Sequence, residues 1–126
     1  MYSLSFGPII NLCQELRQNN GIVIRIITGL KSEPTVDLKQ CLHKTNDKTK
    51  RFKKFLQIGI ETKLVKLEEG LMHNKFAIID DNLLINGSLN WSENAIYHSF
   101  NDVLITREPK LVISYLDYFN KLWFNY

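Results

Sequence analysis

The apolar residues in the first quarter of the chain change from a helical spacing to a strand-like run. From Pro8 to Asn19 they recur every three or four positions, which predicts a helix with proline in its first turn. The Asn-Asn-Gly of residues 19–21 indicates the end of that helix. Residues 22–28, IVIRIIT, are β-branched and nearly all apolar, as in a central strand covered on both faces. We also interpret residues 2–6 as a short strand.

The rest of the chain continues this alternation. Residues 29–45 are polar and irregular, which indicates a loop. In residues 46–57, Phe52, Phe55 and Leu56 share one face with lysines elsewhere, which indicates a short amphipathic helix. The later elements expected are a strand at 61–67, a hairpin of KFAIID and NLLING around Asp81-Asn82, a helical turn in NWSENAIYH, a strand at 102–106 and a helix from Pro109 to Phe124. The sequence therefore predicts one α/β domain over residues 1–126.

Composition narrows the class of protein without identifying it. The 126 residues are 44% hydrophobic and 23% charged, which fits a globular domain, and the net charge of +3 is compatible with an anionic partner. Cys13 and Cys41 make no disulfide framework, so reduced thiols are expected. No apolar run reaches the roughly 18 residues of a membrane-spanning helix, so the chain as given is expected to be soluble. It opens on MYSLSF, which reads as a strand already under way, and we expect an N-terminally incomplete domain.

A group of polar residues interrupts the apolar hairpin. His73 and Lys75 are two positions apart, so on a strand they would share a face. Asp80 lies at the far end of that strand, and Ser88 and Asn90 follow the returning strand. A convergent imidazole, ammonium and carboxamide suit a phosphate, because they provide a nucleophile or proton carrier, a charge and a neutral donor. The plainer interpretation is a solvated strand face followed by turn residues.

The spacing of these residues resembles the HKD signature of the phospholipase D superfamily. The stretches MHNKFAIID, LLINGSLNW and VLIT are most similar to its single-motif animal branch. This branch comprises the mitochondrial cardiolipin hydrolases or Zucchini-type endoribonucleases of piRNA biogenesis. The resemblance runs from Phe6 to the C-terminus and weakens in residues 30–57. It implies a mixed sheet flanked by helices, here lacking its N-terminal strands. The pattern His-x-Lys-x4-Asp-x6-Gly-Ser-x-Asn is matched by His73, Lys75, Asp80, Gly87, Ser88 and Asn90.

The resemblance also implies a reaction. Members of the family combine two motifs, so a chain with one motif is expected to form a homodimer with the two His73 facing each other across a two-fold axis. One His73 would attack phosphorus, and the other would protonate the leaving oxygen and then activate water. Lys75 and Asn90 would hold the non-bridging oxygens. By the same analogy Asp80 is mostly structural, Ser88 braces His73 or a phosphate, and no metal or other cofactor is needed.

The substrate and the location stay open at this point. The motif does not distinguish between two substrates, because single-stranded RNA and a lipid such as cardiolipin contain the same phosphodiester bond. A basic run is either a solvated helix face or a surface that tracks phosphates, and it favours RNA. The resemblance implies the mitochondrial outer membrane, through an anchor that we do not expect in this chain as given. The run comprises Lys44, Lys48, Lys50, Arg51, Lys53 and Lys54, of which Lys50, Arg51 and Lys53 are the substrate-binding candidates.

One position departs from the family pattern. Asn101 stands where related chains usually carry a Glu that is thought to orient the histidine. Asn101 can accept a hydrogen bond but supplies no charge, so we expect a less basic His73 and reduced activity. Asp102 is adjacent, but on a strand it would point to the other face. A second interpretation is therefore a non-catalytic copy that binds phosphate without turnover.

Overall fold

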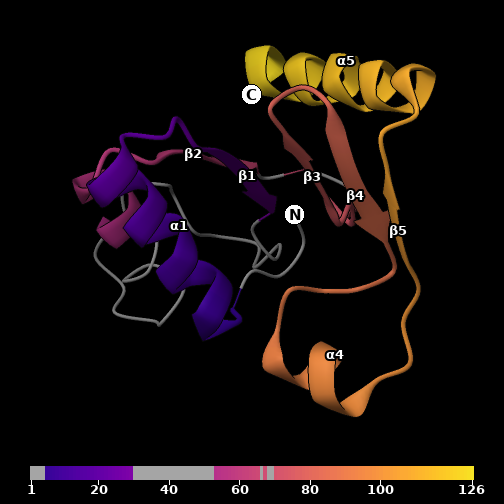
Figure 1. Ribbon diagram of the computed structural model, residues 1–126, viewed down its shortest axis with the longest axis horizontal. Helices are drawn as coiled ribbons and strands as arrows, with labels where there is room; N and C mark the ends of the chain where they lie inside the picture. Colours follow the sequence, from indigo (N-terminus) through magenta and orange to yellow (C-terminus); the bar gives the residue numbers. More distant parts are fainter. Residues whose placement is uncertain (1–4, 30–52, 66, 68–69) are drawn as a thin grey trace.

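The computed structural model describes residues 5–29, 53–65, 67 and 70–126. Residues 53–57 form a helical segment ahead of β2. The alternation of helices and strands confirms the α/β class. Along the chain the elements are α1 Gly7–Asn20, β1 Arg25–Gly29, β2 Glu61–Val65, β3 Phe76–Ile79, β4 Leu83–Gly87, α4 Glu93–His98, β5 Val103–Thr106 and α5 Pro109–Asn125 (Figure 1).

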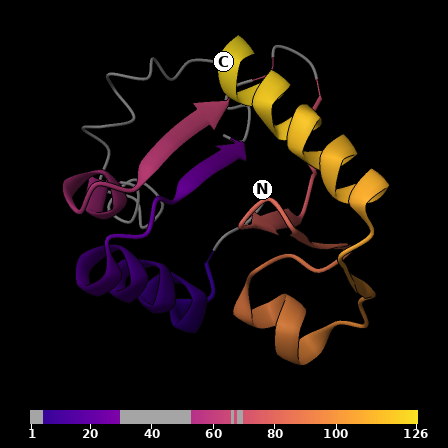
Figure 2. The ribbon, with the colours of Figure 1, turned by 45° about the horizontal axis from the view of Figure 1, so that its top comes forward.

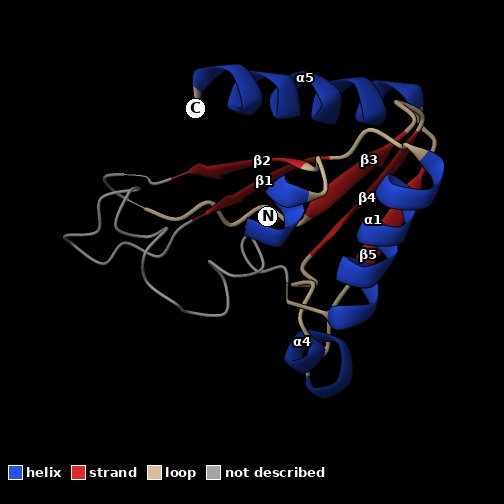
Figure 3. Ribbon diagram, turned by 90° about the vertical axis from the view of Figure 1, so that its left-hand side faces the viewer, coloured by secondary structure: helices blue, strands red, loops and turns tan. Residues whose placement is uncertain are grey.

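The described strands form two sheets. β1 and β2 are a parallel pair, and β3, β4 and β5 form an antiparallel sheet in that order. Both strand directions of the expected mixed sheet are present, but among the described strands no hydrogen-bonded ladder joins β1 to β3. Residues of both these strands instead line a cavity of about 780 Å³. The two sheets lie beside each other under α5 (Figure 3).

Helix α5 covers one face of both sheets. Near its C-terminus Trp123 packs in a buried cluster with Ile27 of β1. Near its N-terminus the Tyr115 hydroxyl accepts a hydrogen bond from Asn86 Nδ2 of β4 at 2.8 Å. The Phe76 ring of β3 meets the Tyr115 ring edge-on, with centroids 5.1 Å apart. One helix therefore joins the parallel and the antiparallel sheet through aromatic side chains.

Two cations reinforce the C-terminal half of α5. The Arg25 guanidinium carbon lies 5.1 Å from the centre of the Phe119 ring and 5.4 Å from that of Trp123. The Lys63 ammonium lies 5.0 Å from the centre of the Trp123 ring and donates to the Trp123 carbonyl. Cations suit this place, because aromatic faces and the carbonyl end of a helix are both electronegative.

Helix α1 packs on the side of the parallel sheet opposite α5 (Figure 2). Ile10 forms a buried cluster with Phe55 of the helical segment 53–57 and Ile60 just before β2. The helix ends at Gly21, whose φ of 65° is left-handed and whose N–H donates to the Leu16 carbonyl. The predicted helix and its glycine stop are therefore confirmed, whereas Leu12 of its apolar spacing is exposed.

Two predictions about the first half of the chain are wrong in detail. The strand expected at 22–28 begins only at Arg25, because the Ile22 N–H still donates to Leu16 of the helix end. Val23 is consequently exposed rather than covered on both faces. Leu56 is also exposed, although its neighbour Phe55 is buried as expected.

The remaining predictions of secondary structure are confirmed where they can be compared. The strand near 61–67, the hairpin, the helical turn, the strand near 102–106 and the closing helix all occur with small shifts of their ends. The loop at 29–45 and the first part of the helix at 46–57 lie outside the described residues, as does most of the strand at 2–6. Ser5 and Phe6, which are described, donate their backbone N–H groups to the Trp91 carbonyl.

The role of α5 as the bridge between the sheets can be tested on two adjacent aromatic residues. Trp123 is 9% exposed and Phe124 is 78% exposed. Trp123→Ala should lower the free energy of unfolding by about 3–5 kcal/mol, as large-to-small changes in a core do. Phe124→Ala, the matched control, should stay within about 0.5 kcal/mol of the parent. Equal losses for the two variants in urea unfolding would contradict the bridging role.

Candidate active site

His73 and Lys75 lie just before the first residue of β3. The prediction that they share a strand face is wrong, because the ladder with β4 begins only at Phe76 and does not impose alternation before it. His73 is exposed, whereas Lys75 is buried with 6% of its surface exposed. The Lys75 Nζ donates to the His73 carbonyl at 2.5 Å. The lysine thus turns back along its own segment and ties it to the backbone of the histidine.

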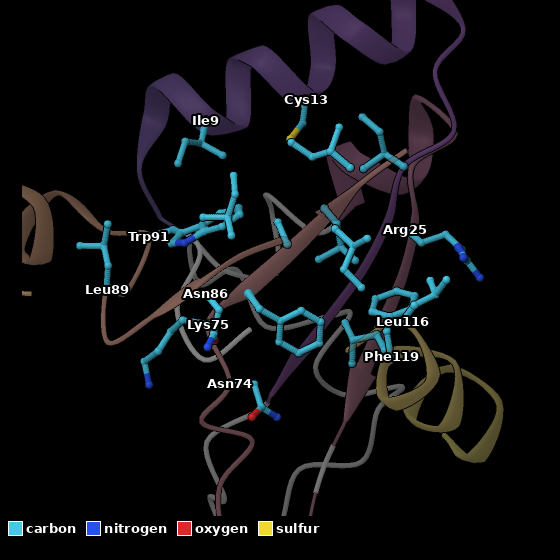
Figure 4. Close-up of a pocket in the computed structure, with 18 of the residues that line it drawn as sticks. Ile9, Cys13, Arg25, Asn74, Lys75, Asn86, Leu89, Trp91, Leu116 and Phe119 are labelled. Atoms are coloured by element: carbon cyan, nitrogen blue, oxygen red, sulfur yellow. The ribbon is translucent and has the colours of Figure 1, made fainter. Parts of the chain in front are cut away.

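The environment of Lys75 is unusually apolar for an ammonium. It lines the 780 Å³ cavity, whose walls are mostly aliphatic side chains from α1, β1, β3 and α5 (Figure 4). Burial lowers the pKa of Lys75 below its ordinary value, because removing water disfavours the charged form. A poorly hydrated cation also attracts an anion more strongly than an exposed one. Lys75 is therefore suited to hold a phosphate oxygen close to His73.

Asn90 lies in the loop after β4, and its carboxamide oxygen has an unusual environment. The Asn90 Oδ1 atom is buried, and the described residues provide it with no hydrogen-bond partner. Leaving a buried acceptor without a donor costs about 1–3 kcal/mol. Such an atom in a native fold calls for an explanation, and one explanation is a donor supplied by a ligand or a second chain.

Gly87 and Ser88 join the end of β4 to the start of β5. A Cβ atom on Gly87 would lie 2.1 Å from the Asp102 carbonyl oxygen, so no side chain fits there. The Ser88 N–H donates to that carbonyl at 3.0 Å, and the Ser88 hydroxyl accepts from the Asp102 N–H at 3.1 Å. The close approach of two strands explains the glycine. In this structure the serine braces β5, whereas the sequence suggested a brace for His73 or a phosphate.

Asp80 lies apart from the other motif residues. It is exposed in the hairpin turn, at the end of β3 opposite Lys75. Asp80 and Asp81 both have a φ of 51°, and the Asn82 N–H donates to the Ile79 carbonyl at 3.1 Å. Aspartate tolerates this left-handed conformation better than most residues. Asp80 therefore helps to shape the hairpin turn.

The other sequence candidates contribute little to this arrangement. Lys50 and Arg51 lie outside the described residues. Lys53 is exposed at the start of the helical segment 53–57. Within the described ranges no three His, Cys, Asp or Glu side chains gather as metal ligands would.

The structure adds a supporting residue that the sequence reading did not single out. The Asn74 Nδ2 donates to the Tyr118 hydroxyl at 3.1 Å, so α5 also holds the segment between His73 and Lys75. Tyr115, one helical turn earlier, holds β4 in the same way. The sequence did contain a signal for these supports. Two tyrosines lie three positions apart on an amphipathic helix, and that spacing places both on one face.

The burial of Lys75 predicts a pH dependence of stability. Its folded pKa is lowered, so folding opposes protonation of this lysine, and the resulting cost fades as the pH rises from the folded pKa to the unfolded one. Relative to Lys75→Met, the parent should therefore gain stability as the pH rises from 7 toward 10, by at most about 1.4 kcal/mol for each unit by which the pKa is lowered. Urea unfolding at several pH values measures this difference. The exposed Lys110→Met is the control, and an equal slope for both variants would contradict the prediction.

Comparisons with known proteins agree on the family. The family described as cardiolipin synthase, PLD-like domain, matches residues 1–123. A mitochondrial cardiolipin hydrolase of Chlamydomonas reinhardtii is 34% identical over 123 residues, which are 98% of this chain and 49% of that protein. Its namesake from Homo sapiens is 45% identical over 56 residues, 44% of this chain and 22% of that protein. The chain thus spans about half the length, or less, of the curated relatives it matches.

Solved structures show the same fold. The phospholipase D family member Nuc from Salmonella typhimurium superposes with a TM-score of 0.75 at 21% identity, over 97% of this chain and 73% of that one. NucT from Helicobacter pylori gives a TM-score of 0.67 at 24% identity, over 96% and 74%. Together with the family match over nearly all residues, these likenesses show that the chain belongs to the family of cardiolipin synthase and phospholipase D-like domains.

Proposed function

We propose that this protein is a metal-independent phosphodiesterase that works through a covalent phosphohistidine. The observation that carries the proposal is the pairing of an exposed His73 with a buried Lys75 whose ammonium is bonded to the His73 carbonyl. An accessible imidazole is able to act as the nucleophile, and the lysine fixed beside it places a positive charge where a phosphate oxygen would lie.

Two displacements at phosphorus complete the proposed reaction. An imidazole nitrogen of His73 attacks phosphorus, and the bond from phosphorus to the leaving oxygen breaks. That oxygen takes a proton from a second imidazole. Water then gives its proton to the second imidazole and attacks phosphorus, which releases the phosphate and restores His73. Lys75 and the Asn90 carboxamide stabilise the charge on the non-bridging oxygens in both steps.

We further propose that the second imidazole is His73 of a second copy in a symmetric homodimer. An apolar surface beside the site supports this assignment, because exposed patches of this kind often mark protein interfaces. It adjoins the junction of Ser88 and Asp102, and a symmetric interface there is able to bring two copies of the site together. We call it the α4–β5 surface. Its exposed residues are Tyr97, Phe100 and, on the edge strand β5, Val103, Leu104 and Ile105, of which Leu104 faces the side opposite the other two.

Single-stranded RNA is the substrate class we propose first, as in piRNA biogenesis. The basic run that includes Lys50, Arg51 and Lys53 supports a polyanion. The printed names of the curated relatives, mitochondrial cardiolipin hydrolases, favour a second candidate, a phosphodiester lipid at mitochondria, with the outer membrane as the finer proposal. None of the helices among the described residues is long and apolar enough to cross a membrane.

The proposed chemistry is tested by comparing two histidines. His73→Asn should lower the cleavage rate of labelled single-stranded RNA or of cardiolipin in vesicles at least about a thousandfold, because nothing replaces the nucleophile. His98→Asn, an equally conservative change at an exposed histidine of α4, should leave it unchanged. Both assays contain EDTA, and the faster substrate identifies the class. Activity retained by His73→Asn would rule out the mechanism.

The homodimer is tested by two isoleucines of similar exposure. Ile105 on β5 is 64% exposed and Ile113 on α5 is 57% exposed. Ile105→Glu should convert a dimer into a monomer in sedimentation velocity and lower the cleavage rate with it, because a charge would be buried in the interface. Ile113→Glu should do neither. A parent chain that is monomeric yet fully active would contradict a site shared between two copies.

A further inference from the structure

The side chain of Asn101 ties both ends of the loop that carries Asn90. Its Oδ1 accepts a hydrogen bond from the Ser88 hydroxyl at 3.3 Å, where the loop leaves β4. Its Nδ2 donates to the carbonyl of Ala95 in α4 at 2.8 Å and to that of Ser99 at 3.1 Å. We call the set of Ser88, Ala95, Ser99 and Asn101 the clasp of the loop.

The clasp needs the chemistry of a carboxamide. Two backbone carbonyls accept from Asn101, and one hydroxyl donates to it, so the side chain must offer two N–H donors and one acceptor. Asparagine provides both functions, whereas an ionised carboxylate is an acceptor only. A carboxylate here would face the two carbonyl oxygens without a proton to share, which is unfavourable.

The hydrogen bonds continue from the clasp to Asn90. The Ser88 hydroxyl accepts from the Asp102 N–H, which fixes the start of the loop. The Ser92 N–H donates to the Asn90 carbonyl at 2.9 Å, and the Ser92 hydroxyl caps α4 by accepting from the Ala95 N–H. Asn90 therefore sits between two anchored points, one at Ser88 and one at the N-terminus of α4.

We infer that Asn101 is a positioning residue that sets the place of Asn90 through Ser88 and α4, and that a carboxylate at this position lowers activity. The inference deepens the proposed phosphodiesterase function and rests on it. It gives Asn101 a different role from the expected one of a weaker substitute for a histidine-orienting Glu. Its side-chain bonds within the described chain go to Ser88, Ala95 and Ser99 rather than to His73.

The test uses the near-isosteric change Asn101→Asp, with Asn94→Asp as its control. Asn94 is an exposed residue of α4, so the control adds the same charge on the same loop outside the clasp. Asn101→Asp should lower kcat at pH 7.5 about tenfold or more with little change in KM, because substrate still binds Lys75 while Asn90 is displaced. Asn94→Asp should stay within twofold of the parent, and Asn101→Glu should be no more active than Asn101→Asp.

A pH series separates positioning from general damage to the fold. A protonated Asp carboxyl regains one donor, so the activity of Asn101→Asp divided by that of the parent should rise as the pH falls through the pKa of the new carboxyl. The same ratio for Asn94→Asp should be flat. An Asn101→Asp or Asn101→Glu variant as active as the parent at pH 7.5 would overturn the inference, and so would a ratio for Asn101→Asp that does not change with pH.

Hydrogen exchange distinguishes failure of the clasp from failure of the proposed function. In the 126-residue chain, backbone amides between Ser88 and Asp102 should exchange about tenfold faster in Asn101→Asp than in the parent, and those of α1 should be unchanged. This result is expected whether or not the parent cleaves a phosphodiester. An inactive parent with the expected exchange would refute the enzyme alone, whereas an unchanged exchange rate would refute the clasp.

Discussion

The arrangement of this protein depends on one helix that spans two sheets. The described strands of the parallel pair and of the antiparallel sheet share no hydrogen-bonded ladder, and side-chain packing on α5 joins the two sheets. The aromatic face of α5 provides it, with Trp123 on the parallel pair and Tyr115 on the antiparallel sheet. The segment that crosses between the sheets carries the motif. Met72, next to His73, is buried in the Trp123 cluster, so the packing that joins the sheets also fixes the proposed nucleophile.

The site separates its functions by exposure. His73, the proposed nucleophile, is exposed, and the side chain of Lys75 is buried against the mostly apolar wall of the cavity. A histidine must be reached by phosphorus, whereas a lysine that only neutralises oxygen charge acts more strongly when water is excluded. The carboxamide oxygen of Asn90 is also buried, and the described residues offer it no hydrogen-bond donor. Gly87 has no side chain, so the backbone of Asp102 approaches it closely. This close approach anchors the start of the loop that carries Asn90.

The sequence predicted the elements whose pattern is local. The spacing of apolar residues identified α1 and α5, and the two runs around Asp81-Asn82 identified the hairpin. The resemblance to phospholipase D-like proteins identified the fold and the family. These features depend on neighbouring residues or on a fixed motif, both of which can be read without coordinates.

What the sequence missed depends on contacts between distant positions. The difference in exposure between His73 and Lys75 arises just before the first residue of the β3 ladder, which the alternation of residues does not reveal. Two of the three partners of Asn101 lie 6 and 13 positions away along the chain, so from the sequence this residue looked like a lost carboxylate rather than the amide that we propose is needed. The packing of Met72 and Trp123 joins residues that are far apart in sequence. Each of these features is a property of the assembled sheets and loops.

The stereochemical course at phosphorus is the measurement that tests the central claim most directly. A phosphorothioate diester of one known configuration would be hydrolysed in ¹⁸O-labelled water, and the configuration of the product would be determined. Two successive in-line displacements, one by His73 and one by water, each invert phosphorus, so the account predicts net retention. Net inversion would mean that water attacks the substrate in a single step, and it would contradict the phosphohistidine on which the proposed function rests.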